Sequence, residues 1–152
     1  MASNGPVTID LIHEISLMFI RILLKCAIGE ELDGVMVDYY ENGVKGQKDI
    51  PYSLRNTFQI MISRTQQLHT IAFPRLAKYH IVQYERDVRD NAKAIRALFE
   101  KMVIKRKALI KDSPQDENLK KDLLGILLSN PATANDDEMI IDECLTFFFA
   151  GS

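Results

Sequence analysis

The chain has 152 residues, of which 47% are hydrophobic and 26% charged, so it has the composition of a globular protein and not of a disordered or fibrous one. Its length allows one ordinary domain with a real core. Nineteen Lys and Arg against 21 Asp and Glu give a formal charge of −2, which argues against a nucleic-acid partner because such proteins carry a basic excess. Two cysteines are too few for a disulfide scaffold, no apolar run approaches the ~20 residues that span a bilayer, and the first residues do not have the order of a signal peptide.

The first predicted element is a core helix from about Leu11 to Ala27. Asp10, or alternatively Thr8, is expected to cap its start, and Gly29 is expected to close its end in a left-handed conformation. Apolar residues recur at steps of three and four, which indicates one buried helix face. These residues are Ile12, Ile15, Phe19, Ile22 and Cys26.

Residues 30–51 are predicted to form an irregular connector with one turn, and a short two-stranded hairpin is the alternative. Residues 35–40 resemble a strand, and Asn42-Gly43 is a strong signal for a tight hairpin turn. The returning limb, residues 44–48, is short, polar and interrupted by glycine, which favours the connector.

Helical periodicity returns over residues 52–72, with Ser53 as the expected N-cap, and again over residues 84–110. The apolar stripes are Leu54, Phe58, Met61, Thr65 and Leu68 in the first of these helices, and Val88, Ala92, Ile95, Phe99 and Met102 in the second. A basic ridge on another face of the second helix is interpreted as solvated surface. It consists of Arg86, Arg89, Lys93 and Arg96. A short helix over 119–128 follows, and Asn135 is expected to cap a last one. The predicted class is all-α with about five helices.

The last helix is apolar on every side beyond Glu143, except at Thr146 and Ser152. A helix that is hydrophobic all round belongs inside a larger protein or a membrane, whereas charged chain ends normally lie at surfaces. We therefore expect residues 1–152 to be a fragment, a single incomplete domain.

Catalytic side-chain motifs do not occur in the sequence. His13-Glu14 begins a metalloprotease-like pattern, but Leu17 stands where the second zinc ligand would be. Glu-x-x-His, nucleophile-elbow, Walker and dinucleotide-binding patterns are also missing. The residues alone therefore predict no metal ligand and no catalytic residue within this chain.

Residues 137–151 resemble the first part of the long central helix of cytochrome P-450 haem-thiolate monooxygenases, which carries an Ala/Gly-Gly-x-acidic-Thr motif over the haem. Ala150, Gly151 and the variable Ser152 match the start of this motif, and the acidic-Thr pair would follow Ser152. Residues 122–128 resemble the short helix before the central one, and 10–29 resemble an earlier helix.

The helices predicted over 52–72 and 84–110 resemble the pair that roofs the substrate pocket in this family. The cytochrome P-450 fold that the resemblance implies is larger than this chain, of which the five helices would be a part. Cys26 and Cys144 lie at helix positions, unlike the loop cysteine that binds the haem iron, and we assign neither as the ligand.

The resemblance implies an enzyme that binds haem iron and hydroxylates a small apolar organic substrate, using O2 and electrons from a redox partner reductase. It implies that Ala150 and Gly151 contact the haem, and that Thr146 and Phe149 line the substrate pocket. It also implies a full-length parent at the endoplasmic reticulum membrane, on the cytoplasmic side, with its anchor outside this chain. The fragment itself is predicted to be inactive. The alternative is a non-enzymatic helical protein-interaction module.

We expect the reading frame to continue beyond Ser152 with an acidic residue followed by Thr or Ser. The reason is that the sequence ends inside an apolar helix. Sequencing the transcript checks this expectation. A stop codon directly after Ser152 would instead support the interaction module.

Overall fold

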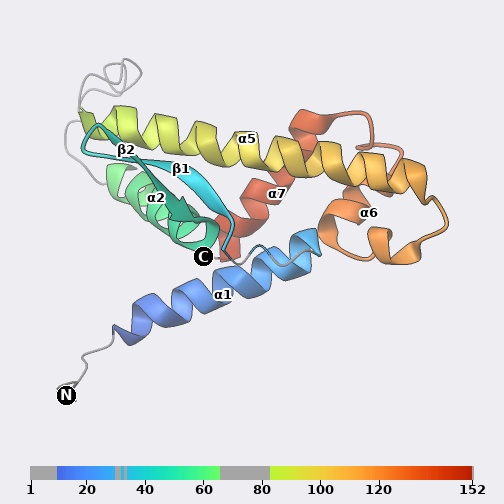
Figure 1. The fold of residues 1–152 in the computed structure, drawn as a ribbon, viewed down its shortest axis with the longest axis horizontal. Helices are drawn as coiled ribbons and strands as arrows, with labels where there is room; N and C mark the ends of the chain where they lie inside the picture. The colour runs from blue at the N-terminus through green and yellow to red at the C-terminus, as the bar shows by residue number, and fades with distance from the viewer. Residues whose placement is uncertain (1–9, 30–31, 33, 66–82, 152) are drawn as a thin grey trace.

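The computed structural model describes residues 10–29, 32, 34–65 and 83–151, which form a mostly helical structure with one two-stranded antiparallel sheet (Figure 1). The elements are α1 (Leu11–Ile28), β1 (Met36–Glu41), β2 (Val44–Asp49), α2 (Ile50–Thr65), α5 (Gln83–Asp112), the 3-10 helix η1 (Glu117–Lys120), α6 (Leu123–Ser129) and α7 (Asp137–Gly151). The predicted helical class is confirmed. Thr8, Ser152 and positions 66–72 of the predicted second helix lie outside the described residues. Within the described part of the chain, every helix is too short or too polar to cross a membrane.

The long helix α5 and the helix α1 lie on opposite sides of the molecule (Figure 1). The hairpin and α2 lie toward the N-terminal end of α5, and η1 with α6 lies toward its C-terminal end. Helix α7 contacts α1, α5 and α6. One hydrophobic core joins all five helices, and its largest fully buried side chains include Leu54, Phe99 and Phe148. The arrangement leaves the C-terminal half of α7 beside α2 and α5.

The connector that we predicted over residues 30–51 is wrong, because residues 36–49 form the hairpin that was the alternative. Glu41 pairs with Val44, so the loop has two residues. Asn42 at φ 53° and Gly43 at φ 78° both adopt the positive φ of a type I′ turn. The turn signal in the sequence therefore outweighed the polar returning limb, which is tolerated because most of β2 is exposed.

The hairpin is held against α5 by side chains rather than by a third strand. The Asn91 side-chain oxygen accepts a hydrogen bond from the Tyr40 N–H at 2.6 Å, and its amide donates to the Tyr40 carbonyl at 2.9 Å. Asp87 accepts from the Gly43 N–H at 3.2 Å. Two residues of α5 thus bind both the strand and the turn, which explains why a ribbon that is marginal alone is stable here.

Both predicted caps of α1 are confirmed. Asp10 accepts a hydrogen bond from the His13 N–H at 3.1 Å, and Gly29 adopts φ 71° and donates to the Lys25 carbonyl. The predicted buried face is wrong. The buried residues are Leu17, Ile20, Leu24, Ala27 and Ile28, whereas the predicted stripe is largely exposed, with Ile12 at 75% and Phe19 at 48%. Helix α1 is apolar on two faces, so its periodicity alone does not identify the face that packs.

Two other predicted caps are corrected. Helix α2 begins at Ile50, so Ser53 is a buried residue inside the helix and not its N-cap. At the start of α7, Asp136 accepts a hydrogen bond from the Met139 N–H at 2.9 Å, one position after the predicted cap Asn135. The helix predicted over 119–128 is divided into η1 and α6, because Asp122 caps α6 through the Gly125 N–H at 2.7 Å.

Arg106 on α5 is a buried charge, with 4% of its surface exposed. Its guanidinium donates to Asp122 Oδ2 at 2.7 Å, to the Leu119 carbonyl at 3.1 Å, and to the Ile28 carbonyl. A buried charge is tolerated only when it is paired and hydrogen-bonded, as it is here. Gly29 leaves room for this network, since a Cβ there would lie 2.2 Å from Asp122 Oδ2.

We predict that Arg106→Met or Asp122→Ala lowers the free energy of unfolding by about 3–5 kcal/mol, because each leaves an uncompensated charge in the interior. Urea unfolding followed by circular dichroism measures the change. Lys45→Ala is the control, because the Lys45–Asp38 pair is exposed (56% and 43% of the side chains) and contributes little. Equal effects of the buried and exposed substitutions would contradict the prediction.

Candidate functional site

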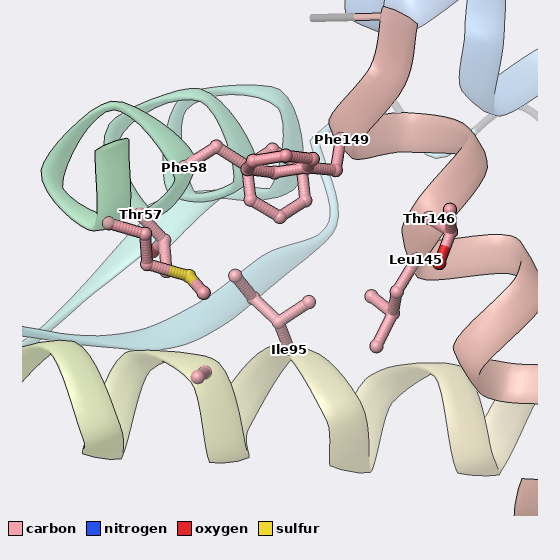
Figure 2. A pocket seen from close by; sticks show the side chains of 8 residues that line it. Thr57, Phe58, Ile95, Leu145, Thr146 and Phe149 are labelled. Atoms are coloured by element: carbon pink, nitrogen blue, oxygen red, sulfur yellow. The ribbon is translucent and has the colours of Figure 1, made fainter. Parts of the chain in front are cut away.

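An apolar pocket of about 230 Å³ lies between α2, α5 and α7 (Figure 2). It is lined by Thr57, Phe58 and Met61 from α2, by Ala92 and Ile95 from α5, and by Leu145, Thr146 and Phe149 from α7. The volume exceeds the ~150 Å³ of an apolar cavity that binds benzene, and lies just below the 300–1,000 Å³ range of drug-sized ligand sites. The pocket therefore fits a compact molecule or one end of a larger one.

Two phenylalanine rings close one side of the pocket. The rings of Phe58 and Phe149 meet edge to face, with centroids 5.4 Å apart and an interplanar angle of 89°. Figure 2 shows this pair bridging α2 and α7, with Ile95 rising from α5 below the pair and Leu145 of α7 beside Ile95. Phe149 remains 45% exposed despite this contact.

Thr146 and Phe149, the two residues expected to line a substrate pocket, are both on the wall of this pocket. Ala150 follows them and is exposed, and Gly151 is the last residue of α7. All four predicted site residues thus lie along the end of α7, and two of them line the pocket. Their roles toward substrate and haem stay predictions.

For other residues that line the pocket, the sequence predicted only that they belong to the hydrophobic core. Phe58, Met61, Ala92 and Ile95 belong to the predicted apolar stripes, and the family resemblance placed their two helices over a pocket. The period of each stripe predicts which face of the helix is buried, but it does not predict which other element packs against that face. Thr57 was missed. The signal that could have revealed it is its place one helical turn before Met61 and next to Phe58, two residues of the predicted apolar stripe.

Two neighbouring hollows share walls with this pocket. One, of about 360 Å³, shares Met61, Ala92 and Leu145, and its remaining wall includes Arg89, Lys93 and Arg96 from the predicted basic ridge. Arg96 pairs with Asp142 at 2.6 Å and Arg89 with Asp90 at 2.9 Å. Acidic partners thus neutralise part of the positive charge on this wall.

The other hollow, of about 230 Å³, lies between α1 and α2. Phe58 is the residue that it shares with the apolar pocket. Its lining is more polar and includes Ser16, Arg55 and Gln59. Phe58 therefore belongs to the walls of both hollows.

The two cysteines differ sharply in environment. Cys144 on α7 is 1% exposed, and burial raises the pKa of its thiol to about 11. Cys26 on α1 is exposed. Among the described residues, no group of three or more His, Cys, Asp and Glu side chains is arranged to hold a metal ion.

Comparison with known proteins gives one relevant similarity. The chain is 30% identical over 154 residues to cytochrome P450 4X1 of Rattus norvegicus, in an alignment that covers 95% of this chain and 27% of that protein. The chain thus spans about a quarter of the length of this curated relative. No family model matches the sequence, and no solved structure matches it. The findings support a distant similarity to a cytochrome P450 over nearly the whole chain.

We predict that Cys26 reacts with a thiol reagent such as iodoacetamide at neutral pH and that Cys144 does not, because its raised pKa and burial suppress the thiolate. Peptide mass spectrometry after timed labelling measures both rates. The folded state holds the Cys144 proton more tightly than the unfolded chain, whose thiol has a pKa near 9.0, so stability falls as the pH rises from there through about 11. Equal labelling rates in the native chain would contradict the buried placement.

Proposed function

We propose that this chain is the substrate-binding part of a haem-thiolate monooxygenase of the cytochrome P450 type, which hydroxylates a small apolar organic molecule. The observation that carries the proposal is the apolar pocket at the end of α7, where Thr146 and Phe149 face α2 and α5. The 30% identity to a cytochrome P450 over nearly all of this chain supports it. Residues 1–152 are then one incomplete domain of the enzyme.

The pocket's part in the reaction is to bind and orient the substrate. Its lining is almost entirely hydrocarbon and aromatic, so it favours an apolar molecule through the hydrophobic effect. The rings of Phe58 and Phe149 restrict the orientation of a flat substrate. Holding the substrate in one orientation is the contribution that the protein makes when a cofactor performs the oxidation.

The described residues fit contact with a haem but not ligation of its iron. Ala150 is small and exposed at the end of α7, which suits close approach of a flat macrocycle. Cys144 is buried among core residues with a raised pKa, and Cys26 lies on α1, away from the residues that line the pocket. In the proposed enzyme, the thiolate ligand comes from residues beyond this sequence. A thiolate-bound haem, when present, supplies the activation of O2.

The other components of the proposed enzyme follow from the same family similarity. O2 is the co-substrate, a redox partner reductase supplies electrons, and the full-length enzyme associates with the endoplasmic reticulum membrane. No residue of this chain is assigned to these three functions.

A helical interaction module is the second candidate. One face of α1 exposes large apolar side chains, including Ile12 at 75% and Met18 at 55%, and such patches mark interaction surfaces. In the monooxygenase, other parts of the enzyme would cover this face. In an interaction module, a separate protein would cover it.

The test of the monooxygenase is expression of the longer reading frame that contains this chain. We expect the reduced, carbon-monoxide-treated protein to show the Soret band of thiolate-ligated haem, whereas the 152-residue chain alone does not show it. We also expect Phe149→Ala in the longer protein to weaken binding of an apolar substrate by about tenfold, equivalent to roughly 1.4 kcal/mol, because it removes an aromatic wall.

Phe147→Ala is the matched control for this substitution. Phe147 is also a half-exposed phenylalanine near the end of α7, at 38%, but it does not line the pocket. Substrate-induced changes in the haem spectrum measure both affinities. If the longer protein binds no haem, the proposed function is wrong. If the two alanine variants lose affinity equally, the pocket is not the substrate site.

A further inference from the structure

We propose that Asn42, in the turn of the hairpin, is a site of spontaneous deamidation, and that Asp87 keeps this reaction slow while α5 holds the hairpin. The reaction converts the carboxamide of Asn42 to a carboxylate without an enzyme or a cofactor. It needs only the turn and water, so it takes place whether or not the chain belongs to a monooxygenase.

The reaction begins when the backbone nitrogen of Gly43 attacks the side-chain carbonyl carbon of Asn42. A bond forms between this nitrogen and Asn42 Cγ, the bond from Cγ to Nδ2 breaks, and ammonia leaves with the proton that the Gly43 nitrogen loses. Water then opens the cyclic imide at either of its carbonyls, which yields aspartate or isoaspartate. Glycine favours the attack because it has no side chain to obstruct it.

The surroundings of Asn42 leave the reacting groups open to solvent. Asn42 and Gly43 are the two loop residues between Glu41 and Val44, and both are exposed. Water can therefore reach the imide, and ammonia can leave. Both residues adopt a positive φ, which fixes the turn as type I′ and makes glycine the favoured residue after Asn42. The turn signal that forms the hairpin thus also brings a reactive pair into the structure.

The attacking nitrogen is held by α5. The Gly43 N–H donates to both carboxylate oxygens of Asp87 at 3.2 Å, and the Gln83 amide donates to Asp87 at 2.9 Å. The Gln83 side chain also covers Gly43, since a Cβ on this glycine would lie 3.1 Å from Gln83 Nε2. Attack requires the nitrogen to lose its proton, and the nearby carboxylate disfavours the negative charge that this loss creates. Asp87 therefore makes the nitrogen a poorer nucleophile.

The closed turn adds a second obstacle. Ring closure requires rotation about the Cα–C bond of Asn42 to bring the Gly43 nitrogen onto the side chain. The pairing of Glu41 with Val44 and the contact with Asp87 fix the peptide group between them. Deamidation in the folded chain therefore proceeds through local openings in which the turn has left α5.

The products do not restore the contact with α5. The imide has no Gly43 N–H, so the Asp87 carboxylate, which is 8% exposed, loses that donor. Isoaspartate lengthens the main chain of a loop whose register allows only two residues. A buried acceptor without its donor is costly, so the reaction is a one-way release of the turn from α5. Asn91 still holds the Tyr40 backbone in the strand.

The first experiment compares the folded 152-residue chain with the same chain unfolded in guanidinium chloride. Peptide mass spectrometry after timed incubation in mildly alkaline buffer measures the asparagine, aspartate and isoaspartate forms of residue 42. Asn4-Gly5, the other Asn-Gly pair of the sequence, is measured in the same digests. The two pairs are expected to react at similar rates in the unfolded chain. Folding is expected to slow the reaction at Asn42 by about tenfold or more, as the loss of a hydrogen bond to a charged group implies.

Two substitutions test the role of Asp87 in the folded chain. Asp87→Asn keeps an acceptor oxygen without the charge, and Asp87→Ala removes both. Deamidation is expected to be slowest in the wild type, faster in Asp87→Asn and fastest, by about tenfold, in Asp87→Ala. Lys45→Ala is the matched control, because it breaks an exposed ion pair with Asp38 on the same hairpin, outside the turn. Its rate is expected to equal that of the wild type.

Circular dichroism checks that each variant keeps its helical content, and Asp87→Asn decides the test if Asp87→Ala does not fold. Equal rates at Asn42 in the folded and unfolded wild-type chain would overturn the proposal. An unchanged or slower rate in Asp87→Asn would also overturn it, and a slower rate would show that the carboxylate acts as a base. A rate in Lys45→Ala that matches Asp87→Ala would show that any loosening of the hairpin suffices, which contradicts the role of Asp87.

Discussion

The buried guanidinium of Arg106 is the contact on which the arrangement of the helices depends. A charge in the interior needs several acceptors, and this one finds them in three elements: the end of α1, η1 and the cap of α6. The Ile28 carbonyl is among the last carbonyls of α1, which have no partner within their own helix. One side chain therefore satisfies the end of one helix and fixes the start of another.

The pocket lies at the other end of α5 and depends on separate contacts for its walls. On one side, the Tyr84 hydroxyl donates to the Ile60 carbonyl at 2.9 Å and fixes α2 against α5. On the other side, Arg96 and Lys107 of α5 pair with acidic residues of α7. Helix α5 is thus the common support that holds both walls at a set separation, while the core residue Phe148 keeps the exposed Phe149 directed toward α2. Polar contacts position the pocket, and apolar side chains form it.

The sequence predicted the helices well, because their periodicity and caps are local signals. Asp10 and Gly29 are examples, since each acts within one helical turn. It failed where the outcome depends on distant residues. The hairpin is stabilised by Asn91, 51 positions from Tyr40, and no local pattern in residues 36–49 contains that information. Likewise α1 has two apolar faces, and only the positions of the other helices decide which one is buried. Spacing and family resemblance placed Thr146 and Phe149 on one face of α7, but the walls that α2 and α5 add to the pocket appear only when the helices are packed.

Phe58 lines both the apolar pocket and the hollow between α1 and α2, so the volume of this one side chain affects the size of both spaces. Each of the two spaces has a volume of about 230 Å³. A smaller residue at this position would enlarge both the apolar chamber and the more polar one, whose lining includes Arg55. A larger molecule would then fit without any movement of the helices.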